Sequence, residues 1–395
     1  MNMTKWLGAV LLSVLLLVTA ACANTGTQEN SQSEKENVSS ETKEKNNAVE
    51  TGNKSLSNIK VLATGGTIAG SSDSDTDTTG YKSGALGIDK VIASVPQLKD
   101  IANVTGEQVA NVGSENVDDA LLLKLAKRVN ELLKDDQVDG IVITHGTDTL
   151  EETAYFLNLV VKSDKPVVVV GSMRPASAIS ADGPLNLYQA VKIASTKEAK
   201  GKGVMVTLND RIASARFVTK TNTTTTDAFK SLEQGYIGVV TGEVVSFYNE
   251  PTRKHTTESD FDVSKIKELP QVDILYGYQN DQKYMYDAAV KAGAKGIVVA
   301  APGNGTMSTE AIKGATDAVK KDVVLVRSSR TGNGIVTHEK TDDEHHFVSS
   351  DSLNPQKARI LLMLALTKTK DPDKVQRYYE QYKLAAALEH HHHHH

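Results

Sequence analysis

The chain has very little cysteine and no excess of basic charge. Cys22 is the only cysteine among 395 residues, so no intramolecular disulfide can form. Lysine and arginine number 44 against 49 aspartate and glutamate residues, a net charge of −5 with no basic stripe, which argues against nucleic acid as a partner. Histidine, cysteine and aspartate do not cluster at metal-ligand spacing. We therefore expect neither a metal nor an organic cofactor.

One long apolar run stands out, and it lies near the start of the sequence. Lys5 precedes this run, which spans residues 6–21 and ends in small residues. The run is short for a membrane span and has the order of parts of a secretory signal. Residues 1–21 are therefore predicted to be a signal peptide.

Cys22 has two interpretations. It could simply lie within a signal peptide, or it could be the lipidated cysteine of a bacterial lipobox, although Thr19 departs from the leucine usual there. Residues 23–58 are rich in Ser, Thr, Glu, Lys, Asn and Gln and cannot bury a core, which favours the lipobox. We expect residues 22–58 to be a lipidated cysteine and a disordered tether. The protein would then be extracytoplasmic, with a lipid anchor as its one attachment to the cell membrane.

From residue 59 the sequence alternates apolar strands with helical segments, the pattern of α/β folds with mainly parallel sheets. Strands are predicted at 59–63, 138–143, 167–170 and 204–208, then at 272–276, 296–300 and 323–326, with a last helix at 356–369. Thr149 and Glu152 have capping-box spacing and predict a helix that starts after Asp148. We expect an N-terminal catalytic domain at 59–249, a polar linker at 250–268 and a C-terminal α/β domain at 269–382. Residues 383–395 are interpreted as a vector-derived tail with a histidine tag.

Two threonine segments follow two of the predicted strands. Residues 63–67 read Ala-Thr-Gly-Gly-Thr, and residues 144–148 read Thr-His-Gly-Thr-Asp. Each places a threonine hydroxyl at a strand end, together with backbone N–H groups that stay accessible because glycine has no Cβ. Open α/β sheets hold ligands at such strand ends. Neither is a phosphate loop, because no Gly-Lys-Ser/Thr follows. Taken alone, Gly65 and Gly66 are better explained by a tight strand-to-helix turn than by a binding site.

Two residues outside these segments, Tyr81 and Lys220, could complete a site with them, and His145 lies within the second segment. Tyr81 is the one aromatic residue of the polar stretch 71–84, which is either a solvated surface loop or a mobile lid over Thr67. His145 is expected to be structural, because nothing beside it marks a serine or cysteine nucleophile. Lys220 resembles a surface charge. If it lies beside Thr147, however, it completes a relay in which the amine could accept a proton.

Four motifs together resemble a bacterial type II L-asparaginase. They are Ala-Thr-Gly-Gly-Thr-Ile-Ala-Gly at 63–70, Ile-Thr-His-Gly-Thr-Asp-Thr at 143–149, Gly-Ser-Met-Arg-Pro at 171–175 and Thr-Lys-Thr-Asn-Thr at 219–223. The resemblance runs from about residue 59 to residue 382. It implies an asparaginase/glutaminase-like fold of two α/β domains, a homotetramer built from tight dimers, and hydrolysis of L-asparagine to L-aspartate and ammonia.

The resemblance also implies roles for individual residues. Thr67 would be the nucleophile and Tyr81 its lid partner, while Thr147, Asp148 and Lys220 would form a second relay. Asp148 would also hold the substrate's α-amino group.

Four further residues would bind substrate. Ser114 would hold the α-carboxylate, and Glu115 stands where many members carry glutamine, which leaves the preference between asparagine and glutamine open. Asn304 and Glu339 would complete the site of a neighbouring subunit.

Two other functions and one other mechanism stay open. The chain could be a glutaminase-asparaginase of broad amide scope, or a lipid-anchored amino-acid binding protein that releases no ammonia. Water could also attack the amide directly, with Thr147 as the key hydroxyl in place of Thr67.

Overall fold

A computed structural model describes residues 55–84 and 86–380. The predicted signal peptide, Cys22, most of the tether and the tail at 383–395 lie outside these residues. Among the helices of the described part, none is both long enough and apolar enough to cross a membrane.

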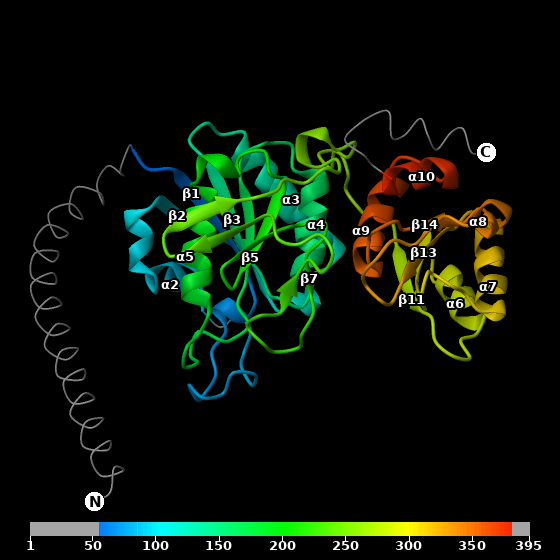
Figure 1. Ribbon diagram of the computed structural model, residues 1–395, viewed down its shortest axis with the longest axis horizontal. Helices are drawn as coiled ribbons and strands as arrows, with labels where there is room; N and C mark the ends of the chain where they lie inside the picture. The colour runs from blue at the N-terminus through cyan, green and yellow to red at the C-terminus, as the bar shows by residue number, and fades with distance from the viewer. Residues whose placement is uncertain (1–54, 85, 381–395) are drawn as a thin grey trace, which may run out of the picture. The chain divides into compact units, whose positions relative to one another are not determined.

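The first domain is built on an eight-stranded sheet (Figure 1). Its parallel strands are β1 (Asn58–Gly65), β2 (Asn103–Val112), β3 (Gly140–Thr144), β4 (Val167–Val170) and β5 (Val204–Leu208). Three antiparallel strands extend it, β6 (Arg211–Ser214), β9 (Gly238–Thr241) and β10 (Val244–Phe247), in the order β10-β9-β6-β5-β4-β3-β1-β2. All four strands predicted for this domain are confirmed, and those at 167–170 and 204–208 have the predicted bounds.

Helices cover both faces of this sheet (Figure 1). One face carries α3 (Asp119–Leu133) and α4 (Leu150–Val160), and the other carries α2 (Ile88–Ala93) and α5 (Gly183–Ala194). Successive strand residues alternate between these faces, so Ile143 packs with the α3 and α4 side and Val142 with the α2 and α5 side. Both faces are buried, which explains the near-continuous apolar strands of the sequence.

The second domain has a parallel sheet in the order β11-β12-β13-β14. Its strands are β11 (Val272–Tyr276), β12 (Gly296–Ala301), β13 (Val324–Ser329) and β14 (Val348–Ser349), and its helices are α6 (Tyr284–Lys291), α7 (Thr309–Lys320), α8 (Lys340–His345), α9 (Pro355–Leu366) and α10 (Pro372–Tyr379). Helix α9 contacts β12 of its own domain and α4 of the first domain. The predicted fold, two α/β domains with mainly parallel sheets, is confirmed.

Two local predictions differ from the structure, those of the last helix and of the Thr149 cap. The helix at 356–369 is not the last one, because α10 follows it, capped by Asp371 with a proline in its first turn. The predicted linker at 250–268 stays a prediction; within it, Phe261 and Val263 are buried in the main core. Thr149 is the N-cap of α4, but its hydroxyl does not cap the helix and instead donates to the carbonyl of Ser114 (2.8 Å).

Candidate active site

The threonine segments lie where the order of the first sheet reverses. From β1 the chain moves to its outer neighbour β2, and it then returns to add β3 on the other side of β1. Parallel strands of an open sheet hold ligands outside their carboxyl ends at such a switch point. Thr67 follows β1, Ser114 follows β2 and Thr147 follows β3, so three adjacent strand ends contribute to one place.

Glycine allows the loops after β1 and β3 to touch. Gly66 has a φ of 86°, and a Cβ added there would lie 2.4 Å from the backbone nitrogen of Gly146. A Cβ added to Gly146 would lie 2.8 Å from the Cβ of Ser114. Side chains at either position would therefore push the loops apart. These contacts explain the glycines better than a tight turn alone does.

Thr67 and Tyr81 form a hydrogen-bonded pair. Thr67 begins the short 3-10 helix η1 (Thr67–Ala69), is buried, and shares a hydrogen bond between its Oγ1 and the hydroxyl of Tyr81. The Tyr81 ring packs on Gly70, where an added Cβ would lie 2.9 Å from the ring. Backbone hydrogen bonds between Ser71 and Lys82 (2.8 and 3.2 Å) close the base of the loop. The phenol of Tyr81 therefore reaches Thr67, while its action as a lid stays a prediction.

Lys220 lies beside both Thr147 and Asp148. It belongs to β7 (Thr219–Lys220), which pairs with β8 (Phe229–Lys230). Its ammonium donates to Thr147 Oγ1 (2.9 Å) and to Asp148 Oδ1 (2.7 Å). The Lys220 side chain is 14% exposed, whereas that of Asp148 is 65% exposed and free to meet a ligand. Lys220 is therefore not an isolated surface charge, because its ammonium bonds both Thr147 and Asp148, as the predicted relay requires.

A buried carboxylate that the sequence analysis missed holds Lys220 in place. Glu151, in the first turn of α4, accepts hydrogen bonds through Oε1 from Thr219 Oγ1 (3.0 Å) and from the Lys220 backbone N–H (3.2 Å). Its Oε2 accepts from Asn354 Nδ2 (3.0 Å), at the start of α9. The second domain therefore helps to position strand β7 of the first domain, which carries Lys220. Glu151 follows the second threonine motif closely, but nothing in the sequence reveals its distant partner.

His145 is a structural residue. It is buried, its Nδ1 bonds the carbonyl of Gly146 (2.7 Å) and its Nε2 bonds the hydroxyl of Thr153 (2.7 Å). These partners fit a neutral ring that donates from Nδ1 and accepts at Nε2. Burial lowers the pKa of His145 to about 4, and the bond to Gly146 opposes this shift only in part. The expectation of a satisfied structural histidine agrees with this geometry.

This burial predicts a pH dependence of stability. The unfolded chain protonates His145 below its ordinary pKa of 6.5, whereas the folded chain does so only near 4, so stability falls as pH falls between these values. From about pH 7.5 to about pH 5, His145 should cost about 2 kcal/mol of unfolding free energy. Urea unfolding at both pH values measures this difference in unfolding free energy. His145→Asn should lose this part of the pH dependence, whereas the exposed control His346→Asn should keep it; equal slopes in both variants would contradict the assignment.

Ser114 and Glu115 lie in the 3-10 helix η3 (Ser114–Asn116) after β2. Ser114 is buried, and its Oγ accepts a hydrogen bond from the Thr149 backbone N–H (3.2 Å). Glu115 is exposed, and its carboxylate folds back so closely that a Cβ added to Gly113 would lie 2.3 Å from Oε1. Ser114 thus joins the loop after β3, while Glu115 stays open to solvent.

Asn304 and Glu339 are brought together in the second domain. Asn304 follows β12 and Glu339 is the N-cap of α8. Asn304 Nδ2 donates to Thr337 Oγ1 (2.7 Å) and, at 3.4 Å, to Glu339 Oε1. The Thr337 hydroxyl donates to the same Glu339 oxygen (2.7 Å). Asn304 and Glu339, to which the family resemblance assigned roles one by one, therefore belong to one hydrogen-bonded group.

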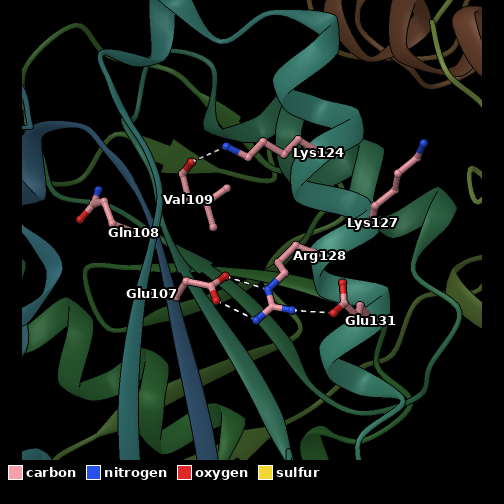
Figure 2. A pocket seen from close by; sticks show the side chains of 7 residues that line it. All are labelled: Glu107, Gln108, Val109, Lys124, Lys127, Arg128 and Glu131. Carbon is pink, nitrogen blue, oxygen red and sulfur yellow. Dashed lines mark hydrogen bonds and ion pairs between the residues drawn. The ribbon is translucent and has the colours of Figure 1, made fainter.

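A surface pocket between β2 and α3 is a different feature (Figure 2). Its charged groups already have partners: Arg128 pairs with Glu107 (2.7 Å) and Glu131 (2.9 Å). Lys124 and Lys127 donate to the carbonyls of Val109 (3.0 Å) and Ile266 (2.6 Å). Its lining does not include the predicted catalytic side chains. Within the described residues, no group of three or more His, Cys, Asp or Glu side chains could hold a metal ion.

Comparison with known proteins matches both domains to family models. The asparaginase N-terminal model matches residues 58–253, and the glutaminase/asparaginase C-terminal domain model matches residues 271–379.

Individual relatives agree with these family models. The chain is 61% identical over 373 residues to L-asparaginase 2 of Bacillus subtilis, covering 94% of this chain and 98% of that protein. It is 49% identical over 330 residues to a glutaminase-asparaginase of Pseudomonas fluorescens, covering 83% of this chain and 91% of that protein. The crystal structure of a probable cytoplasmic L-asparaginase from Campylobacter jejuni matches with a TM-score of 0.81 and 52% identity, covering 82% of this chain and all of that one.

These matches agree with the geometry of the paired threonine loops and confirm the resemblance to bacterial type II L-asparaginases. The chain belongs to the asparaginase family.

Proposed function

We propose that this enzyme hydrolyses L-asparagine to L-aspartate and ammonia through a covalent intermediate on Thr67. The observation that carries the proposal is the pairing of Thr67 with the Tyr81 hydroxyl at the switch point of the sheet, beside the Thr147, Lys220 and Asp148 group. The names of the relatives support amide hydrolysis as the reaction class.

In the first step Thr67 Oγ1 attacks the carbon of the side-chain amide. A hydroxyl needs a proton acceptor to attack an amide, and Tyr81 is hydrogen-bonded to it. The oxyanion that forms would be held by backbone N–H groups near Gly66 and Thr147, where one such donor contributes about 3–4 kcal/mol. The amide nitrogen takes up the proton that Thr67 loses and leaves as ammonia.

The second step releases aspartate. Water attacks the β-aspartyl ester, the bond to Thr67 Oγ1 breaks, and the threonine regains a proton. Lys220, which donates to Thr147 and Asp148, would stabilise the charge that develops beside Thr147. The alternative in which water attacks first would make Thr147 the key hydroxyl.

The remaining site residues would bind the amino-acid part of the substrate. The exposed carboxylate of Asp148 suits an α-ammonium group, and Ser114 would bind the α-carboxylate. Asn304 and Glu339 of a neighbouring copy would add a second acceptor group for the ammonium, which requires a homo-oligomer and, by resemblance, a tetramer.

The segment before the first domain would determine where the enzyme works. Residues 1–21 would direct export, and lipidated Cys22 would anchor the exported enzyme to the cell membrane. Loss of fatty-acid labelling in Cys22→Ala tests this anchoring.

An ammonia-release assay on L-asparagine and L-glutamine tests the function. We expect turnover of asparagine. Glutamine turnover at a similar kcat/KM would support the broad glutaminase-asparaginase, a reading that the Pseudomonas relative favours. Binding of either amino acid without ammonia release would instead support the binding-protein alternative.

Glu115 provides a prediction about binding of the substrate's α-ammonium group. If its carboxylate faces the α-ammonium, Glu115→Gln should raise KM about two- to fivefold for both amides, because an exposed ion pair contributes about 0.2–1 kcal/mol. The kcat values should change little, since the α-amino group does not react. Steady-state kinetics on both amides measure this. A change confined to glutamine would mean that Glu115 reads side-chain length instead.

A further inference from the structure

Two loops of the second domain meet through one buried arginine. Asn304 lies in the loop after β12, and Thr337 and Glu339 lie in the loop after β13. Arg327, on β13, is 5% exposed and donates hydrogen bonds to both loops.

Every nitrogen of the Arg327 guanidinium donates a hydrogen bond. Nη1 donates to the carbonyls of Asn304 (3.2 Å) and Gly305 (2.9 Å), and Nη2 donates to the carbonyl of Thr337 (2.9 Å). One planar group therefore holds the backbone of both loops. Gly305 leaves room for it, since a Cβ added there would lie 2.7 Å from Nη1.

Asp342 completes this arrangement and extends it to Glu339. Its carboxylate accepts from Arg327 Nε and Nη2, at 2.6 Å each, in the two-pronged geometry typical of arginine and carboxylate. Asp342 Oδ2 also accepts from the backbone N–H of Glu339 (2.8 Å), as part of the capping box of α8. The pair thus fixes the main chain of both Asn304 and Glu339.

We infer that Arg327 and Asp342 are a positioning pair that sets the geometry of Asn304 and Glu339 for recognition of the substrate's α-ammonium group. This inference rests on the proposed function, in which those two residues bind that group. A lysine could not replace Arg327, because one ammonium cannot bond three carbonyls and both carboxylate oxygens in this plane. Misplacement of a binding group by about 1 Å can cost about a hundredfold in rate.

The test compares two substrates of the intact enzyme, L-asparagine and succinamic acid, which is asparagine without its α-amino group. Arg327→Lys should lower kcat/KM for asparagine about ten- to hundredfold, mainly through KM, and change that for succinamic acid little. Asp342→Asn provides a second variant with the same expected selectivity. Arg330→Lys is the matched control, because Arg330 lies three residues away and donates to Gly277 instead (3.1 Å).

Two outcomes separate this inference from the proposed function. If Asn304→Ala leaves the ratio of the two kcat/KM values unchanged, the proposed binding role of Asn304 is wrong. If Asn304→Ala lowers the ratio but neither Arg327→Lys nor Asp342→Asn does, the positioning role is wrong. An equal loss for both substrates, together with a lower Tm, would show a purely structural ion pair and would overturn the inference.

Discussion

Thr67→Ala should lower kcat for asparagine hydrolysis by about four orders of magnitude or more, because loss of a nucleophile removes the covalent route entirely. KM should change much less, since the predicted contacts to the α-amino and α-carboxyl groups remain. The variant should still fold, because Thr67 contributes only a small buried side chain and one hydrogen bond to Tyr81. Ammonia release by purified wild type and variant, with Tm as a check of folding, measures this effect.

Thr67→Ser is the matched control, because it keeps the hydroxyl and removes only a methyl group. It should retain activity far above that of the alanine variant. A Thr67→Ala enzyme with more than about a tenth of wild-type kcat would contradict a nucleophilic role for this residue. Direct attack by water, with Thr147 as the key hydroxyl, would then be the better mechanism.

The second large effect is expected at Lys220. Lys220→Met removes the donor to Thr147 and Asp148 while it keeps most of the side-chain volume, and kcat should fall about 10²- to 10⁴-fold. Stability should change little, since Asp148 is exposed and water can replace its lost partner. The pH dependence of kcat and of kcat/KM, measured on the residual activity, would show whether the amine takes part in proton transfer.

Lys230→Met is the control for Lys220→Met. Lys230 lies on the paired strand β8, opposite Thr219, and its ammonium lies 3.4 Å from the carboxylate of Asp227. It should have near-wild-type kinetics. If both lysine variants lost activity equally, the loss would reflect disturbance of the β7 and β8 hairpin instead of a role for Lys220.

Of the three strands whose ends form the site, β1 and β3 could be predicted because they are apolar and largely buried, whereas β2 was missed because it is polar and only partly buried. Val167–Val170 is a run of four β-branched residues buried on both faces, and its bounds match the prediction. The short strands β7 and β14 have two residues each, too few for any periodic pattern. Helix α10 was missed although Asp371 and Pro372 mark its start, because it is short and largely polar.

The residues of the candidate site also fall into those that the sequence predicts and those that it does not. Its threonine, glycine and lysine residues lie in motifs that the sequence displays, and the structure brings Thr147, Asp148 and Lys220 into contact. Glu151 and Arg327 could not be predicted, because their roles depend on partners from distant segments. Glu151 bonds Asn354, 203 positions away in the sequence, and Arg327 bonds carbonyl groups that carry no sequence signal. A buried charge acquires its function only when the fold supplies its acceptors and donors.

The central claim, that Thr67 forms a covalent intermediate, can be tested by trapping that intermediate. Wild-type enzyme would be mixed with a slowly hydrolysed β-amide of aspartate, quenched in acid, digested and examined by mass spectrometry. We predict an aspartyl ester on the peptide that contains Thr67, absent from Thr67→Ala treated in the same way. An adduct on the peptide that contains Thr147 instead would contradict the assignment of Thr67 as the nucleophile.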